Sequence, residues 1–212
     1  MKLAEMTVSQ FVDAVASDAP APGGGSVAAL EGSVGAALTA MVACLTQGRK
    51  KYAAFAGYAA EVEKKGVDLR ARLLDVMDRD TEAFNAVSAA FGMPKDPDEQ
   101  KAARSAAIQE GLKGCTMTPL EMMELCADGI ALAASLRERG FNDTAASDLG
   151  VALLSLRSGL QGAWLNVLIN IGSLKDRAFA EECRKRGEAL LARALPLADG
   201  GYAAIVAMLE GA

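Results

Sequence analysis

The sequence predicts an all-α fold, an antiparallel bundle of about six to eight helices that forms a single domain over residues 1–212. Alanine, leucine and glutamate dominate the composition, aromatic residues make up 5% of it, and runs of β-branched residues are short. Together these features favour helix over strand. Because the breaks between the predicted helices are short, we expect neighbouring helices to pack antiparallel.

Start and stop signals place the individual helices. Thr7 and Gln10 form a capping box, and Thr118 and Glu121 repeat it with Pro119 at the first helical position. We expect helices at about residues 7–17, 25–48, 54–91, 98–114, 118–139, 144–173 and 176–197, and a short helix near 200–210.

Several glycines lie inside the predicted helices, where each costs up to ~1 kcal/mol relative to alanine. They are Gly32, Gly35, Gly150, Gly159 and Gly162. Close contact between helices, within one chain or between subunits, is the usual reason for keeping them. The longest apolar run, residues 27–45, approaches the length of a membrane span, but it is mostly alanine and contains Glu31, so we expect a buried helix.

The charge of the chain argues against general binding to nucleic acid or to anionic membranes, because 27 acidic residues outnumber 22 basic ones. The sequence has no histidine, and its cysteines are far apart at positions 44, 115, 126 and 183. We therefore expect no metal site, no Ser-His-Asp or Cys-His catalysis, and reduced packing thiols in a cytoplasmic protein. Acid–base chemistry would fall to carboxylates, lysine, tyrosine or the substrate itself.

Asp80 departs most clearly from its local pattern. It falls on the apolar stripe of the predicted helix 54–91, which consists of Leu69, Leu73, Val76, Phe84, Val87 and Phe91. Burying an unpartnered carboxylate is costly. Asp80 is therefore either a site residue that faces a cavity or an internally hydrogen-bonded acid.

A small or polar stripe runs along the helix predicted from residue 144. Its members are Asp148, Ser155, Gly159, Gly162, Asn166 and Asn170. The stripe can line a cleft in which the two asparagine amides hold the donor–acceptor edge of a heterocycle. The alternatives are a close helix contact bridged by the asparagines and, for Asp148, a first-turn acid that the helix dipole favours.

Two further segments can bind anionic or polar groups. The first is the glycine turn, Gly23, Gly24, Gly25 and Ser26, whose backbone N–H groups begin an apolar helix. Its alternative is a simple turn with Ser26 as N-cap. The second is Arg49, Lys50 and Lys51, which can anchor a carboxylate-bearing tail or only complement the negative end of their helix.

Four stretches resemble, in order, segments of the formiminotransferase-cyclodeaminase family and its free-standing methenyltetrahydrofolate cyclohydrolase members. They are Pro20–Leu30, with its proline and triple-glycine signature, Asp80–Phe84, Asn142–Asp148 and Gly162–Asn170. The resemblance spans about residues 11–176. One departure is that relatives often carry proline after the asparagine that precedes the serine–aspartate pair, whereas Asp143 follows Asn142 here.

The resemblance implies a homodimeric helical bundle that binds a reduced folate as substrate in a cleft, without a stable cofactor. It implies either hydrolysis of 5,10-methenyltetrahydrofolate to 10-formyltetrahydrofolate or closure of 5-formiminotetrahydrofolate to the methenyl form with loss of ammonia. We expect the cyclohydrolase, because no formiminotransferase domain is attached in this sequence. The alternatives of other classes are a non-catalytic helical scaffold or regulatory dimer, and a phosphate- or nucleotide-binding protein.

Within that expectation, physical chemistry suggests a role for each candidate residue. Asp80 or Asp148 would be the catalytic carboxylate. Asn166 and Asn170 would orient the pterin, and the glycine turn with Ser26 would bind a polar edge of the ligand. Arg49, Lys50 and Lys51 would hold the glutamate tail. Asn142 and Ser147, in the turn that resembles the family, complete the expected substrate-binding residues.

Overall fold

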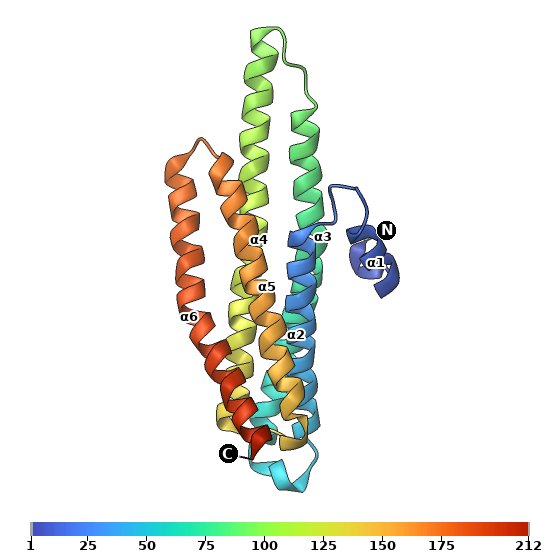
Figure 1. Ribbon diagram of the computed structural model, residues 1–212, viewed down its shortest axis with the longest axis vertical. Coiled ribbons are helices and arrows are strands. Elements are labelled where there is room, and N and C mark those ends of the chain that lie inside the picture. Colours follow the sequence, from blue (N-terminus) through green and yellow to red (C-terminus); the bar gives the residue numbers. More distant parts are fainter. Residues whose placement is uncertain (1, 212) are drawn as a thin grey trace.

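The computed structural model describes residues 2–211, and over this range the chain is helical with no strand (Figure 1). The α-helices are α1 (Val8–Val15), α2 (Gly24–Thr46), α3 (Ala56–Phe91), α4 (Asp98–Arg139), α5 (Ala146–Ser173) and α6 (Arg177–Glu210). Short 3-10 turns lie at Leu3–Glu5, Lys50–Phe55 and Asp143–Ala145. The predicted all-α class is confirmed.

The five long helices form an elongated bundle (Figure 1). In this view α2 and α5 lie side by side at the front, α3 and α4 lie behind them, and α6 packs against α4 and α5. The hairpin of α3 and α4 extends well beyond the first residue of α2. The first turn of α2 therefore faces the sides of its neighbours, and not solvent at the end of the bundle.

The helix α4 is continuous where the sequence predicts a break. Thr118 does not begin a new helix, because its hydroxyl donates to Gly114 O within the same helix at 3.1 Å. Pro119 inside a helix costs about 3 kcal/mol. Full burial of Leu120 and Met122 offsets this, since each such side chain contributes about 1.5–3 kcal/mol. The prediction of two helices is wrong because core packing overrides the capping signal.

Of the other sequence signals for where helices begin and end, one is confirmed and one is wrong. The capping box at Thr7 is confirmed: its hydroxyl accepts from Gln10 N at 3.3 Å, and Gln10 Oε1 accepts from Thr7 N at 2.9 Å. The predicted separate helix near 200–210 is wrong, because α6 runs through Pro196 to Glu210. Ala198 and Ile205 are buried against the bundle, and this packing stabilises the part of α6 after Pro196 as a continuation of the same helix.

Glycines allow α2 and α5 to approach closely, as predicted. A Cβ atom on Gly159 would lie 2.7 Å from Ala28 O, and one on Gly35 would lie 2.8 Å from Ala152 O. Real Cβ atoms do not come so near to backbone atoms. This contact brings the first turn of α2 against the second half of α5.

The helix α2 is only partly the buried helix that was expected. Its side toward α3 and α5 is closed, with Val42 and Ala43 at 0% exposure. On its outer side Val34, Met41 and Leu45 are 46%, 38% and 40% exposed. Both α2 and α6 are long and apolar enough to cross a membrane, but the core helix of a soluble protein passes the same test. The outer side of α2 therefore stands out as an unpaired apolar surface.

Candidate functional site

A cavity of about 370 Å³ lies where α2 begins. Its walls come from the segment that leads into α2 and from α3, α4 and α5. They are Pro20, Ala21, Gly23, Gly24, Gly25, Asp80, Thr81, Phe84, Val87, Phe91, Leu112, Cys115, Asn166, Ile169, Asn170 and Ser173. The volume lies in the usual range for small-molecule sites. The cavity brings together the glycine turn, Asp80 and both asparagines that the sequence singles out.

Asp80 supplies the carboxylate of this cavity. Ser26 Oγ lies 3.4 Å from Asp80 Oδ2 and donates to it, and Thr81 Oγ1 lies 3.3 Å from the same Ser26 hydroxyl. Burial raises the pKa of Asp80, and the hydrogen bond from Ser26 opposes this rise with a smaller effect. Among residues 2–211 no cation pairs with Asp80. A carboxyl in such surroundings can exchange a proton nearer neutral pH than an exposed aspartate can.

The glycine turn is shaped around that carboxylate. A Cβ on Gly25 would lie 2.6 Å from Asp80 Oδ1, so only glycine lets Asp80 rest against the first turn of α2. Gly23 is the N-cap residue, and the backbone N–H groups of the first helical residues have no acceptor within the helix. The N-cap alternative for Ser26 is wrong, because Ser26 is the third residue of α2 and its hydroxyl is turned to Asp80.

Both asparagines of α5 face the same cavity, and each uses its amide nitrogen on a backbone carbonyl. Asn166 Nδ2 donates to Gly162 O at 2.9 Å, within α5. Asn170 Nδ2 donates across the bundle to Cys115 O of α4 at 2.7 Å. The sequence left open a helix contact bridged by asparagine in place of a ligand cleft, and the structure contains both the bridge, through Asn170, and the cavity. The amide oxygens remain available to a ligand.

The remaining wall is apolar and comes largely from residues that the sequence assigned to the core. Phe84 and Phe91 are 37% and 52% exposed, because α3 extends beyond the helices that would cover them. Phe84 and Phe91 follow Asp80 by four and eleven residues, which puts all three on one helix face, and this spacing was the signal that could have identified them as site residues. Cys115 was interpreted as a packing thiol, and burial raises its pKa to about 11. The thiol therefore stays protonated at neutral pH.

The other predicted site residues lie at the far end of the bundle. With α2 spanning 23 residues, the two ends are separated by about 35 Å. Arg49, Lys50, Lys51 and Ser147 are exposed there, and Asp148 is half-buried in the first turn of α5. Within one chain the structure does not bring any of them to Asp80.

Lys51 and Asn142, two predicted site residues at this far end of the bundle, have clear local contacts. Lys51 Nζ pairs with Asp143 Oδ2 at 2.6 Å, and this contact lowers the pKa of Asp143. Asn142 is buried, donates through Nδ2 to Leu45 O at 3.2 Å, and accepts from Thr144 N at 3.2 Å. Asn142 therefore joins the end of α2 to the turn before α5.

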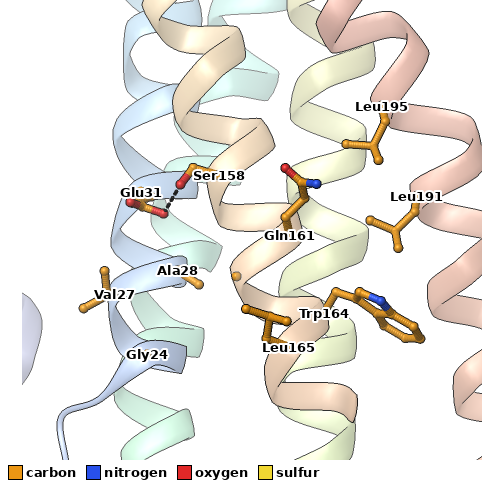
Figure 2. Close-up of a pocket in the computed structure, with 11 residues that line it drawn as sticks. Gly24, Val27, Ala28, Glu31, Ser158, Gln161, Trp164, Leu165, Leu191 and Leu195 are labelled. Carbon is orange, nitrogen blue, oxygen red and sulfur yellow. Dashed lines mark hydrogen bonds between the residues drawn. The ribbon is translucent and has the colours of Figure 1, made fainter. Parts of the chain in front are cut away.

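A second recess, of about 540 Å³, lies on the outer side of α2, α5 and α6 (Figure 2). Figure 2 shows the Ser158 hydroxyl donating to Glu31, at 2.7 Å, on one side of it, and Trp164, Leu191 and Leu195 on the other. A groove of about 800 Å³ between α3 and α4 carries charges of both signs. Neither recess brings together the whole glycine turn, Asp80 and both asparagines, so the Asp80 cavity is the candidate site.

The fold and this cavity define an all-α bundle protein whose site pairs a half-buried carboxylate with the N-terminal turn of a helix. The family model described as formiminotransferase-cyclodeaminase matches residues 7–189. The chain belongs to this family, as the sequence resemblance indicated.

Individual relatives agree with this assignment. Methenyltetrahydrofolate cyclohydrolase of Methylorubrum extorquens is 47% identical over 196 residues, which cover 92% of this chain and 94% of that protein. Formimidoyltransferase-cyclodeaminase of Sus scrofa is 38% identical over 186 residues, and the match covers 87% of this chain but only 34% of that protein. The crystal structure of formiminotetrahydrofolate cyclodeaminase from Thermotoga maritima superposes with a TM-score of 0.82 at 28% identity, covering 98% of this chain and 97% of that one.

Proposed function

We propose that this protein is a 5,10-methenyltetrahydrofolate cyclohydrolase that produces 10-formyltetrahydrofolate. The observation that carries the proposal is the half-buried Asp80 carboxylate against the first turn of α2, which has no cationic partner among residues 2–211. The methenyl group is a cation shared by N5 and N10, and a carboxylate in a partly enclosed cavity favours such a charge. The similarity to the Methylorubrum extorquens cyclohydrolase over nearly its whole length supports the same reaction.

The chemistry can be written with Asp80 as the only titrating group. Water adds to the methenyl carbon, and Asp80 accepts one of the water protons. The C–N5 bond then breaks while the remaining hydroxyl proton is lost to solvent, leaving the formyl group on N10. Asp80 returns its proton to N5, so that the whole reaction releases one proton. The raised pKa of Asp80 suits a group that must both take and give a proton.

The ring system of the substrate would occupy the rest of the cavity. Phe84 and Phe91 offer apolar surface to the flat part of the pterin, and the amide oxygens of Asn166 and Asn170 accept from its N–H groups. The free backbone N–H groups of the glycine turn suit a carbonyl oxygen or an anionic edge. The pterin is thus held from both sides while its N5–N10 region faces Asp80.

We propose a homodimer, and the apolar face that α2 and α5 share supports it; these two helices lie at the front of Figure 1. Its exposed side chains are Val34, Met41 and Leu45 of α2 and Val151, Leu154, Leu165 and Ile169 of α5. Glu31 is the only charged residue in the sequence of α2. A predominantly apolar face of this kind is self-complementary, so a second copy of the chain is its natural partner.

The proposed dimer would also explain how the distant candidate residues could take part in the site. A two-fold axis that packs these faces with their helices antiparallel sets the far end of one α2 beside the Asp80 cavity of the other chain. Arg49, Lys50 and Lys51 of a second copy can then reach the glutamate tail, and Asp148 can approach the cavity. Within a single chain the separation of about 35 Å prevents both.

A cyclodeaminase is the second candidate function, favoured by the similarity to the Thermotoga maritima cyclodeaminase along the whole chain. Closing 5-formiminotetrahydrofolate requires proton transfer at the same carbon, so Asp80 would serve either reaction. For either reaction we propose a cytoplasmic protein of folate metabolism that uses no metal or stable cofactor.

The test mixes the purified protein with 5,10-methenyltetrahydrofolate and follows the methenyl absorbance against the uncatalysed decay. Accelerated decay supports the cyclohydrolase. Formation of the methenyl product and ammonia from the 5-formimino compound, without accelerated decay, supports the cyclodeaminase. Inactivity in both assays would favour a non-catalytic scaffold. If nucleotides, and not folates, raised the melting temperature of the protein, a nucleotide-binding protein would be favoured.

A further inference from the structure

Pro119 interrupts the series of backbone hydrogen bonds along α4 next to the Asp80 cavity. A helical N–H donates to the carbonyl four residues earlier, so Pro119, which lacks an N–H, leaves Cys115 O without its usual donor. The hydroxyls of Thr116 and Thr118 donate to other carbonyls of the same helix. Cys115 O is therefore the carbonyl that needs a donor from elsewhere.

Asn170 supplies that donor from α5, since its Nδ2 lies 2.7 Å from Cys115 O. A carbonyl can only accept, so the amide nitrogen must be the atom that faces it, and the orientation of the amide is determined. Asn170 Oδ1 then points away from Cys115, on a residue that lines the Asp80 cavity. Within residues 2–211 no group donates to this oxygen.

Asn166, one turn earlier, is held differently. Its Nδ2 donates to Gly162 O at 2.9 Å, and in a regular helix that carbonyl also accepts the backbone N–H of Asn166. The Asn166 amide therefore depends on α5 alone. The Asn170 amide depends on a carbonyl that is free only because residue 119 is proline.

We propose that Pro119 is a positioning residue: it frees Cys115 O, which orients Asn170 so that Oδ1 accepts a hydrogen bond from a pterin N–H of the folate. This proposal rests on the proposed folate chemistry of the cavity. An acceptor that is already oriented binds a donor without the cost of ordering the side chain. The proline thus contributes to substrate affinity although its own ring need not touch the substrate.

The variant Pro119→Ala restores a backbone N–H that competes with Asn170 for Cys115 O. We expect the KM for 5,10-methenyltetrahydrofolate to rise about tenfold, the scale of one hydrogen bond, with kcat changed less than twofold. The melting temperature should not fall, because alanine replaces a proline in a helix interior. A purely structural proline would change stability and leave KM alone.

A double-mutant cycle isolates the coupling. Asn170→Ala should raise KM by a similar factor, and Pro119→Ala should add nothing in that background. Pro196→Ala removes the other proline inside a helix, in α6, and is the matched control that should leave KM unchanged. An unchanged KM in Pro119→Ala, or independent effects of the two substitutions, would overturn the proposal.

A readout without substrate separates this proposal from the proposed function. The side-chain amide signals of Asn170 in a ¹⁵N–¹H spectrum are the pair lost in Asn170→Ala, and Pro119→Ala should shift them and speed their exchange with water. Unchanged signals would overturn the role of Pro119. Wild-type protein that is inactive on both folates would overturn the proposed function and pterin as the ligand of Asn170, whatever the amide signals do.

Discussion

Gly25→Ala tests whether the Asp80 carboxylate must rest against the first turn of α2. The added Cβ would lie 2.6 Å from Asp80 Oδ1 and 2.7 Å from Asp80 Cγ, whereas non-bonded carbon atoms prefer about 3.5–4.0 Å. The carboxyl group must therefore retreat by about 1 Å. A displacement of that size in a reacting group costs about 10²-fold in rate. We expect kcat/KM to fall by about this factor.

The fold should survive the same substitution. Overpacking costs about 1–3 kcal/mol, and alanine recovers up to ~1 kcal/mol relative to glycine inside a helix. A net loss of at most about 3 kcal/mol is small beside the roughly 5–15 kcal/mol by which most proteins are stable. A thermal melt monitored by circular dichroism measures this loss.

Gly57→Ala is the matched control. Gly57 is the second residue of α3, as Gly25 is of α2, and its added Cβ would meet no heavy atom within 4 Å. Its initial rate in the methenyl absorbance assay should equal that of the wild type. If Gly25→Ala also retained wild-type turnover, the placement of Asp80 against α2 would not matter for catalysis.

Four further predictions test the site, its supports and the apolar face. Asp80→Asn should keep the fold and folate affinity and lower turnover by about 10²-fold or more in the absorbance assay, and unchanged turnover would exclude Asp80 from the chemistry. Because burial raises the pKa of Asp80, the folded protein binds the Asp80 proton more tightly than the unfolded chain does. As the pH falls through the raised pKa to the ordinary value of 3.8, the free energy of unfolding of the wild type should therefore increase relative to that of Asp80→Asn. Urea unfolding that shows the same pH dependence for both proteins would contradict this. Asn142→Ala should lower the free energy of unfolding by about 2–3 kcal/mol, since it removes three hydrogen bonds of a buried amide; lost turnover with intact stability would make Asn142 a site residue instead. Leu165→Asp should yield folded monomers in sedimentation, because Leu165 is 66% exposed on the apolar face, and a persistent dimer would refute that interface.

The helices were predictable wherever the repeat of apolar residues continued, and least so at proline. Thr118 and Pro119 carry a strong local signal for a helix start, yet α4 passes through them. The signal failed because Leu120 and Met122, directly after Pro119, are both fully buried in the bundle, and a helix that continues through Pro119 keeps both of them in the core. Pro196 in α6 repeats this outcome.

The candidate site was predictable where one residue contradicted its own surroundings. Asp80 was visible as a carboxylate on an apolar stripe, and the turn before Ser26 was visible as three consecutive glycines. The exposure of Phe84 and Phe91 was not visible, because aromatic residues on an apolar stripe normally belong to the core. It follows from the length of α3 beyond the start of α2.

By itself the sequence determined the helical class, most helix positions and the family, because helical periodicity, capping and the glycine signature are properties of neighbouring residues. The tertiary structure alone decided which candidates meet. Asp80 and Asn170 are 90 positions apart and share one cavity, whereas Asn142 and Asp148, though much nearer to Asn170 in the chain, lie at the opposite end of α5. The reason is that a helix separates residues by 1.5 Å each along its axis, while helix packing brings together whatever lies at the same height of the bundle.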